Sequence, residues 1–115
     1  MVPSTVSAVV MVAFPFSDLS QTKLRPAIVL ADAGRGDWVL CQVTSNPYAD
    51  ARSVLLENSN FSIGSLQVTS YARPGKLFTA SDSLIRSEVG VLQLDAFKRV
   101  LTAVTELFQP QKTTL

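Results

Sequence analysis

The spacing of apolar residues changes once along the chain, and this change limits the folds that the chain can adopt. Near the end of the chain, apolar residues recur at helical intervals, at Phe97, Val100, Leu101, Val104, Leu107 and Phe108. This spacing predicts one amphipathic helix with a single apolar face. Asp95 lies near its expected start, where the helix dipole favours an anion, and Pro110 is expected to end it. Such a face needs an apolar surface to pack on.

Upstream of this helix, apolar residues come in strand-length runs separated by turn residues. The predicted strands are residues 9–14, 26–31, 38–44, 51–56, 66–71 and 76–79. Gly34 and Gly36 predict a tight hairpin between the second and third strands. Loops are expected at residues 17–24 and 57–64, and breaks at Asn46-Pro47-Tyr48 and Arg73-Pro74-Gly75. The pattern predicts a mainly β (α+β) fold, with one twisted sheet of about five to seven strands, closed or nearly so, and the C-terminal helix packed on it.

Composition narrows the functional classes. The chain has 115 residues, 47% of them hydrophobic, so a single domain over residues 1–115 with a real core is expected. The net charge of +1 is not that of a dedicated nucleic-acid binder, so a polyanion would need a local basic patch. The chain has no histidine, and Cys41 is its one cysteine. We therefore expect no disulfide within the chain, no metal and no cofactor, and an inert buried Cys41.

The most hydrophobic stretch near the start, residues 6–16, is too short to span a membrane. The residues before it, MVPST, carry no basic side chain, unlike the start of a signal peptide. We therefore interpret this stretch as a buried strand and expect a cytoplasmic protein with no membrane partner.

Polar groups gather at the ends of two predicted strands. Lys23 and Arg25 stand where the second strand is expected to start, and Thr44, Ser45 and Asn46 follow the third. Because a hairpin joins these strands, both groups should lie at the same end of the sheet, to within a residue or two of register. A guanidinium beside two hydroxyls suits a phosphodiester. The plainer interpretation is a solvated loop arginine and an ordinary Thr-Ser turn, and spacing alone does not choose between them.

Four stretches, taken in order, resemble the motifs of the PemK/MazF toxin family over residues 9–108. They are FPFSDLSQTKLRPAIVLA, CQVTSNP, GSLQVTSYARPGKLFTASDSLI and GVLQLDAFKRVLTAVTELF. One departure is Ser7-Ala8, which stands where family members usually have Gly-Asp or Gly-Glu. The resemblance implies a small SH3-like, CcdB-like barrel. It also implies the toxin of a type II toxin–antitoxin system, a homodimer that an antitoxin inhibits by covering its RNA groove.

The implied activity is a metal-independent endoribonuclease that cleaves single-stranded mRNA. By resemblance, Arg25 and Thr44 are the catalytic residues. The expected substrate-binding residues are Asp18, Ser20, Gln21, Lys23, Ser45, Asn46, Tyr71 and Arg73. Tyr48, Phe61 and Tyr71 are candidates for base stacking, although core packing is favoured for Phe61. Arg73 and Lys76 either line the groove or are solvated.

Two matters stay open at this level. A guanidinium does not give up its proton, so the general base is Asp18 or a strong base is unnecessary. The alternative function is a catalytically weak or inactive protein-binding module, related in fold to a toxin that poisons DNA gyrase. The tail QPQKTTL lacks the Trp of that toxin, which disfavours the alternative. A general SH3-like nucleic-acid adaptor is disfavoured by the net charge of +1.

Overall fold

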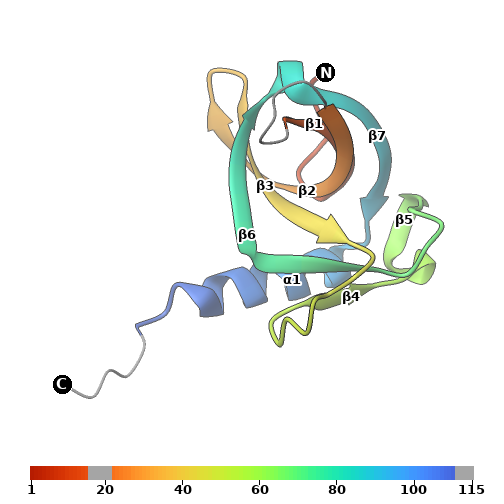
Figure 1. The fold of residues 1–115 in the computed structure, drawn as a ribbon, viewed down its shortest axis with the longest axis vertical. Coiled ribbons are helices and arrows are strands. Elements are labelled where there is room, and N and C mark those ends of the chain that lie inside the picture. Colours follow the sequence, from red (N-terminus) through yellow and green to blue (C-terminus); the bar gives the residue numbers. More distant parts are fainter. Residues whose placement is uncertain (16–21, 111–115) are drawn as a thin grey trace.

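A computed structural model of the chain describes residues 1–15 and 22–110 (Figure 1). Within these ranges the chain forms seven strands, one α-helix and two short 3-10 helices. In chain order they are β1 (Ala8–Pro15), β2 (Thr22–Gly34), β3 (Asp37–Thr44), β4 (Val54–Leu56), η1 (Asn58–Asn60), β5 (Phe61–Gly64), β6 (Ser70–Ser81), η2 (Asp82–Leu84), β7 (Ile85–Leu92) and α1 (Leu94–Leu107). None of the described helices is both long and apolar enough to cross a membrane.

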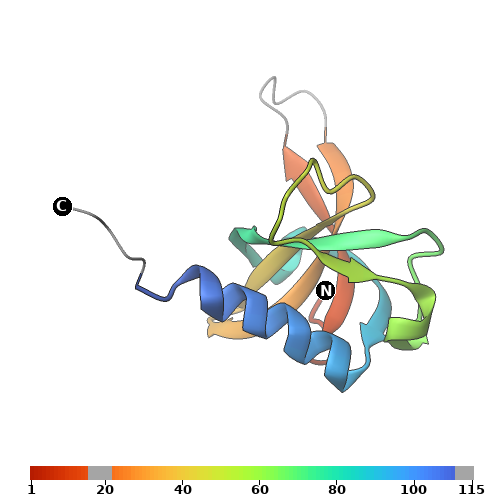
Figure 2. The same cartoon turned by 90° about the horizontal axis from the view of Figure 1, so that it is seen from below.

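The seven strands form one antiparallel sheet in the order β4-β6-β3-β2-β1-β7-β5. The sheet curls strongly into a half-barrel, and the short strands β4 and β5 are its two edges (Figure 1). Helix α1 lies across one side of this sheet (Figure 2). This arrangement confirms the predicted fold class.

Apolar residues are buried on both faces of the sheet, as the strand period of two requires. Val9 and Ile28 belong to one cluster, which α1 covers with Ala96, Phe97 and Val100. Val10, Ala27 and Val29 alternate with them and belong to a second cluster, on the opposite face of the sheet, with Leu40 and Ile85. The predicted helix is confirmed, and its apolar face packs against the first cluster.

The hairpin between β2 and β3 is also confirmed. Arg35 and Gly36 form its two-residue turn with φ values of 57° and 79°. Positive φ at both central residues matches the right-handed twist of the flanking strands. Gly34, with a φ of 88°, then pairs with Asp37.

The start of β2 differs from the prediction. The strand begins at Thr22, so Lys23 and Arg25 lie inside it rather than in a loop before it. The physical reason is pairing with β1, which runs from Pro15↔Thr22 to Val9↔Ile28. The ladder with β3 starts only at Ala27↔Gln42, just beyond Pro26, which has no N–H to donate.

Several expectations for the middle of the chain were wrong. The Arg73-Pro74-Gly75 segment does not end a strand, because β6 runs from Ser70 to Ser81 without interruption. Its ladder with β3 shifts between Cys41↔Leu77 and Val43↔Ala72, so residues 73–76 form a bulge at which β6 bends (Figure 1). A bulge leaves backbone groups unpaired and therefore accommodates proline and glycine.

The remaining differences concern strand limits. The predicted strand 51–56 is reduced to Val54–Leu56, and the predicted strand 66–71 begins only at Ser70. Residues 61–64, expected in a loop, form β5. Strand β7 was missed, because Glu88 and Gly90 are poor strand formers. Pairing with β1 and β5 supplies what local propensity does not.

Candidate functional site

Arg25 and Thr44 come from neighbouring strands, and the strand register brings them together. In β1 and β2, Arg25 pairs with Val12, and in β2 and β3, Ala27 pairs with Gln42. Arg25 and Thr44 each stand two residues beyond this last pair, at the same end of the hairpin. The half-buried Arg25 is therefore a neighbour of Thr44 across the hairpin.

Both residues line one pocket of about 200 Å³. Lys23 and Ser45 also line it, and its remaining lining residues are Leu24, Pro26, Val43, Leu66, Val68 and Ser70. The pocket thus combines two cations with hydroxyl groups on a partly apolar floor. None of the described lining residues has a carboxylate. An anion with several acceptor oxygens, such as a phosphate group, is the ligand that this set of donors suits.

The Thr44 hydroxyl has a defined orientation. Its Oγ1 accepts a hydrogen bond from the backbone N–H of Asn46 at 3.1 Å, and Asn46 Oδ1 accepts one from the N–H of Tyr48 at 2.9 Å. A hydroxyl that accepts a hydrogen bond still carries its own hydrogen and can donate it. Thr44 therefore anchors the loop after β3 and keeps a donor for a ligand oxygen.

The predicted substrate-binding residues divide into three groups. Lys23 and Ser45 line the pocket with Arg25 and Thr44, whereas Asn46, Tyr71 and Arg73 are not among its lining residues. Asp18, Ser20 and Gln21 lie outside the described residues. Tyr71 pairs with Thr44 across β3 and β6, so it lies in the next strand from the pocket. Sequence reasoning did not assign Leu66, Val68 and Ser70 to the site, because their alternation resembles an ordinary half-exposed strand.

Arg73 lies in a small cluster beside the site. Its Nε donates to Asp50 Oδ2 at 3.1 Å, and its guanidinium carbon lies 5.3 Å from the centre of the Tyr48 ring. Asp50 Oδ1 also accepts the backbone N–H of Arg52 at 2.9 Å. The N–H of Arg52 and the guanidinium of Arg73 lower the pKa of the Asp50 carboxyl. Of the two earlier expectations, groove residue or solvated side chain, Arg73 matches neither fully, because it is held in an ion pair.

Two sequence expectations about inert residues are confirmed. Phe61 is only 8% exposed and belongs to the core cluster under α1, so it is not a stacking surface. Cys41 is fully buried, and burial raises the pKa of its thiol to about 12. Its Sγ–H donates to the backbone carbonyl of Arg73 at 3.3 Å. A thiol in this state is not a nucleophile at neutral pH.

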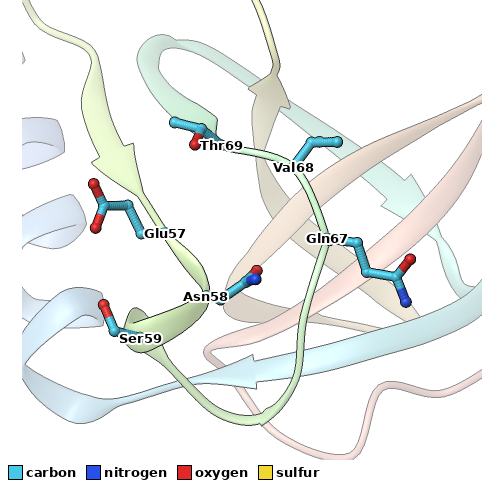
Figure 3. Close-up of a pocket in the computed structure, with 6 residues that line it drawn as sticks. All are labelled: Glu57, Asn58, Ser59, Gln67, Val68 and Thr69. Atoms are coloured by element: carbon cyan, nitrogen blue, oxygen red, sulfur yellow. The ribbon is translucent and has the colours of Figure 1, made fainter.

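A second pocket, of about 400 Å³, adjoins the first. Figure 3 shows its lining, which comes from two segments that face each other: Glu57, Asn58 and Ser59 on one side, and Gln67, Val68 and Thr69 on the other. Val68 lines both pockets, so the two hollows lie side by side at this residue. The described lining of the second pocket has amide and hydroxyl groups and the carboxylate of Glu57, but no cation. Its amide and hydroxyl groups can make neutral hydrogen bonds to a ligand, whereas the first pocket can bind an anion.

The fold and these hollows define a small, curled β protein with a cationic pocket where two central strands meet. Residues 6–108 match the family model described as the PemK-like, MazF-like toxin of type II toxin–antitoxin systems. The chain therefore belongs to this toxin family. A comparison with curated protein sequences found no match.

Solved structures share the fold. The chain is similar to a MazE–MazF crystal structure from Deinococcus radiodurans, with a TM-score of 0.71 and 20% identity over 89% of this chain and 92% of that one. It is similar to the Mycobacterium tuberculosis toxin MazF-mt6, with a TM-score of 0.70 and 15% identity over 91% and 99% of the two chains. An endoribonuclease solved with its cognate antitoxin, from a mycobacterial species, matches with a TM-score of 0.65 and 16% identity over 93% and 95%.

Proposed function

We propose that this protein is a metal-independent endoribonuclease that cleaves single-stranded mRNA and acts as the toxin of its toxin–antitoxin pair. Arg25 and Thr44 are its catalytic residues in this proposal. The observation that carries it is that both line one pocket, together with Lys23 and Ser45. Membership of the toxin family and the fold shared with a mycobacterial endoribonuclease give further support.

The proposed chemistry uses the RNA's own nucleophile. The 2′-oxygen attacks the adjacent phosphorus and loses its proton, and the bond from phosphorus to the 5′-oxygen breaks as that oxygen gains a proton. The products are a 2′,3′-cyclic phosphate and a free 5′-hydroxyl. Negative charge grows on the nonbridging oxygens in the transition state. A guanidinium keeps its charge and can make two parallel hydrogen bonds to such oxygens.

In this proposal Arg25 stabilises the transition-state charge and hydrogen-bonds the leaving 5′-oxygen, which takes its proton from solvent water because the guanidinium keeps its own. The Thr44 hydroxyl donates to a nonbridging oxygen while the Asn46 N–H holds it in place. Lys23 and Ser45 bind the flanking backbone. The general base is Asp18, or a strong base is unnecessary. With no histidine in the chain, a modest rate follows from either choice.

The rest of the substrate is proposed to continue along the hollows that meet at Val68. Sequence-specific RNA recognition needs unpaired bases, which is why a single strand is proposed. Asn46, Tyr71, Arg73, Ser20 and Gln21 remain proposed contacts on this path. We further propose a cognate antitoxin that covers the groove, and a homodimer. Two of the similar structures are toxins solved with an antitoxin, which supports the first of these partners.

The test is cleavage of a long unstructured RNA by the purified protein in EDTA, read as discrete fragments with 2′,3′-cyclic phosphate ends. Arg25→Ala should reduce the rate by about a hundredfold to a thousandfold, the effect of losing one positioned donor to a developing oxyanion. Arg35→Asn is the matched control. It removes an arginine from the turn that follows the other end of β2, and asparagine tolerates the φ of 57° there.

Equal cleavage by wild type and Arg25→Ala would point to a contaminating nuclease and defeat the proposal. Cleavage that appears only when divalent metal is restored would defeat its metal-independent part. Recovery of topoisomerase subunits by a wild-type protein that leaves RNA intact would favour the protein-binding alternative instead.

A further inference from the structure

Tyr48 presents a large aromatic ring to solvent beside the candidate site. It is 64% exposed, and one face of its ring is covered by the Arg73 guanidinium, whose carbon lies 5.3 Å from the ring centre. The ring belongs to the loop between β3 and β4, four residues after Thr44. Four residues span at most about 14 Å, so the ring lies within reach of nucleotides next to a phosphate held at Thr44.

The backbone under this ring is held in an unfavourable conformation. Tyr48 has a φ of 53° and Ala49 a φ of 57°, in the left-handed region that non-glycine residues avoid. Two successive residues of this kind persist only when surrounding contacts hold them, and such strain gathers at ligand-binding sites. Here the N–H of Tyr48 donates to Asn46 Oδ1 at 2.9 Å, and the N–H of Asp50 donates to the Pro47 carbonyl at 2.9 Å.

Arg73 is itself held in place by Asp50. Its Nε donates to Asp50 Oδ2 at 3.1 Å, and the two side chains are only 19% and 18% exposed. Asp50 in turn accepts the N–H of Arg52 at 2.9 Å. The cation on the covered face of the ring is therefore held in place before any ligand arrives. An aromatic ring that is immobilised on one face and open on the other loses little conformational freedom when a flat group stacks on it.

We propose that Tyr48 is a base-stacking platform. An unpaired nucleobase next to the scissile phosphate stacks on the face of the Tyr48 ring that Arg73 does not cover. Asp50 is a positioning residue for this platform, and Arg73, in addition to its proposed contact with the RNA, holds the covered face of the ring. This inference rests on the proposed function and specifies the role of one residue in it. Every base has a π face, so the platform contributes affinity with little sequence preference.

The chemistry of the cluster favours a nucleobase over a peptide side chain. Asp50 offsets the charge of Arg73, but Arg52 also acts on Asp50 and leaves the cluster with one net positive charge. This charge suits a partner that carries a phosphate backbone, and the guanidinium polarises the ring. A cationic side chain of a protein partner would instead approach a ring already occupied by a cation.

The experiment measures binding apart from cleavage, with a pool of unstructured 2′-O-methyl oligoribonucleotides that lack the attacking hydroxyl. Tyr48→Asn removes the ring and suits the left-handed backbone, so the fold is retained. It should weaken binding by about tenfold to a hundredfold, and Tyr48→Phe should bind like wild type. Phe108→Ala is the matched control, because Phe108 is 70% exposed on the distant end of α1 and should leave binding unchanged.

A spectroscopic measurement tests the stacking itself. Tyr48→Trp adds an exposed indole to a chain whose one tryptophan, Trp38, is half-buried. Stacking should quench the new fluorescence on oligonucleotide binding, whereas the wild-type signal should stay nearly constant. Arg73→Lys keeps the charge but loses the flat guanidinium, so it should weaken both binding and quenching while the salt dependence stays as in wild type.

The outcomes separate this inference from the proposed function. Arg25-dependent cleavage with unchanged binding by Tyr48→Asn would overturn the platform alone. Tyr48-dependent binding without any cleavage by wild type would support the platform and overturn the nuclease. If Tyr48→Asn loses an antitoxin but not the oligonucleotide, the ring is a protein contact and the inference is wrong. Failure of the wild type to bind the oligonucleotides would overturn both.

Discussion

Removing only the Thr44 hydroxyl is a sharp perturbation of the candidate site. Thr44→Val preserves the shape and the β-branched character of the side chain in β3. It removes a donor to the proposed nonbridging oxygen and the acceptor of the Asn46 N–H, which lies 3.1 Å from Oγ1. Thr44→Ser keeps both functions and serves as the conservative control.

The two losses have different sizes. A neutral hydrogen bond contributes about 0.5–1.5 kcal/mol to stability, and the exposed Asn46 N–H can turn to water, so we expect the lower end of that range. A donor that acts on a developing oxyanion is worth about 2.7–4 kcal/mol, or a hundredfold to a thousandfold in rate. The rate should therefore fall far more than the stability.

The assay pairs steady-state cleavage over a range of RNA concentrations with urea denaturation of the same protein samples. Thr44→Val should lower kcat with little change in KM, because its hydroxyl acts in the transition state, and Thr44→Ser should stay within a few-fold of wild type. Cleavage by Thr44→Val at the wild-type rate would refute the catalytic role. A stability loss of several kcal/mol would refute the reasoning that separates the two effects.

Two further predictions concern the core. Gly90→Ala places a Cβ 2.5 Å from the Ile63 carbonyl oxygen and 2.8 Å from the Phe61 ring, so it should lower the free energy of unfolding, measured by urea denaturation, by about 1–3 kcal/mol. Gly75→Ala is the control, because no heavy atom lies within 4 Å of its new Cβ, and it should leave the free energy of unfolding unchanged. The pKa of Cys41 is raised to about 12 from an ordinary 9.0, so the folded state holds the thiol proton more tightly than the unfolded state. The free energy of unfolding should therefore be unaffected by this group below about pH 9 and should fall between about pH 9 and 12. A wild-type pH profile of stability that matches the profile of Cys41→Ala would contradict this prediction.

The local sequence pattern was enough to predict the elements whose formation depends on residues close in sequence. The helix was predictable because its apolar period and its stop signal are both local, and α1 ends within a few residues of Pro110. The β2–β3 hairpin was predictable because Arg35-Gly36 adopts positive φ, for which glycine is suited. Both elements would be expected from the same short segments in other proteins.

Long-range pairing decided the elements that were predicted wrongly. β7 contains Glu88 and Gly90, and β5 follows directly on a 3-10 turn, so neither has a strong strand signal of its own. β7 becomes a strand because β1 and β5 supply hydrogen-bonding partners on its two sides, and β5 becomes one because it pairs with β7. β6 continues through Pro74 because a bulge against β3 removes the need for an N–H there.

In the candidate site, too, one part was predictable from the sequence and another part was not. The hairpin register, estimated from the turn alone, was close enough to set Arg25 beside Thr44, and the pocket includes both. The role of Arg73 was not visible, because its ion pair with Asp50 and its contact with Tyr48 join residues from different strands and loops. The spacing of residues in the sequence does not predict contacts of this kind.

By itself, the sequence determined the β character of the chain, its closing helix, the hairpin and the chemical types available for a phosphodiester. These follow from periodicity, turn chemistry and side-chain identity, which act over a few residues. Only the tertiary structure decided which strands form the sheet, where β2 begins, and which cations line the Thr44 pocket while Arg73 is held in an ion pair. Those features depend on contacts between distant segments, and their free energy is gained only when the curled sheet and α1 together bury the two clusters of side chains.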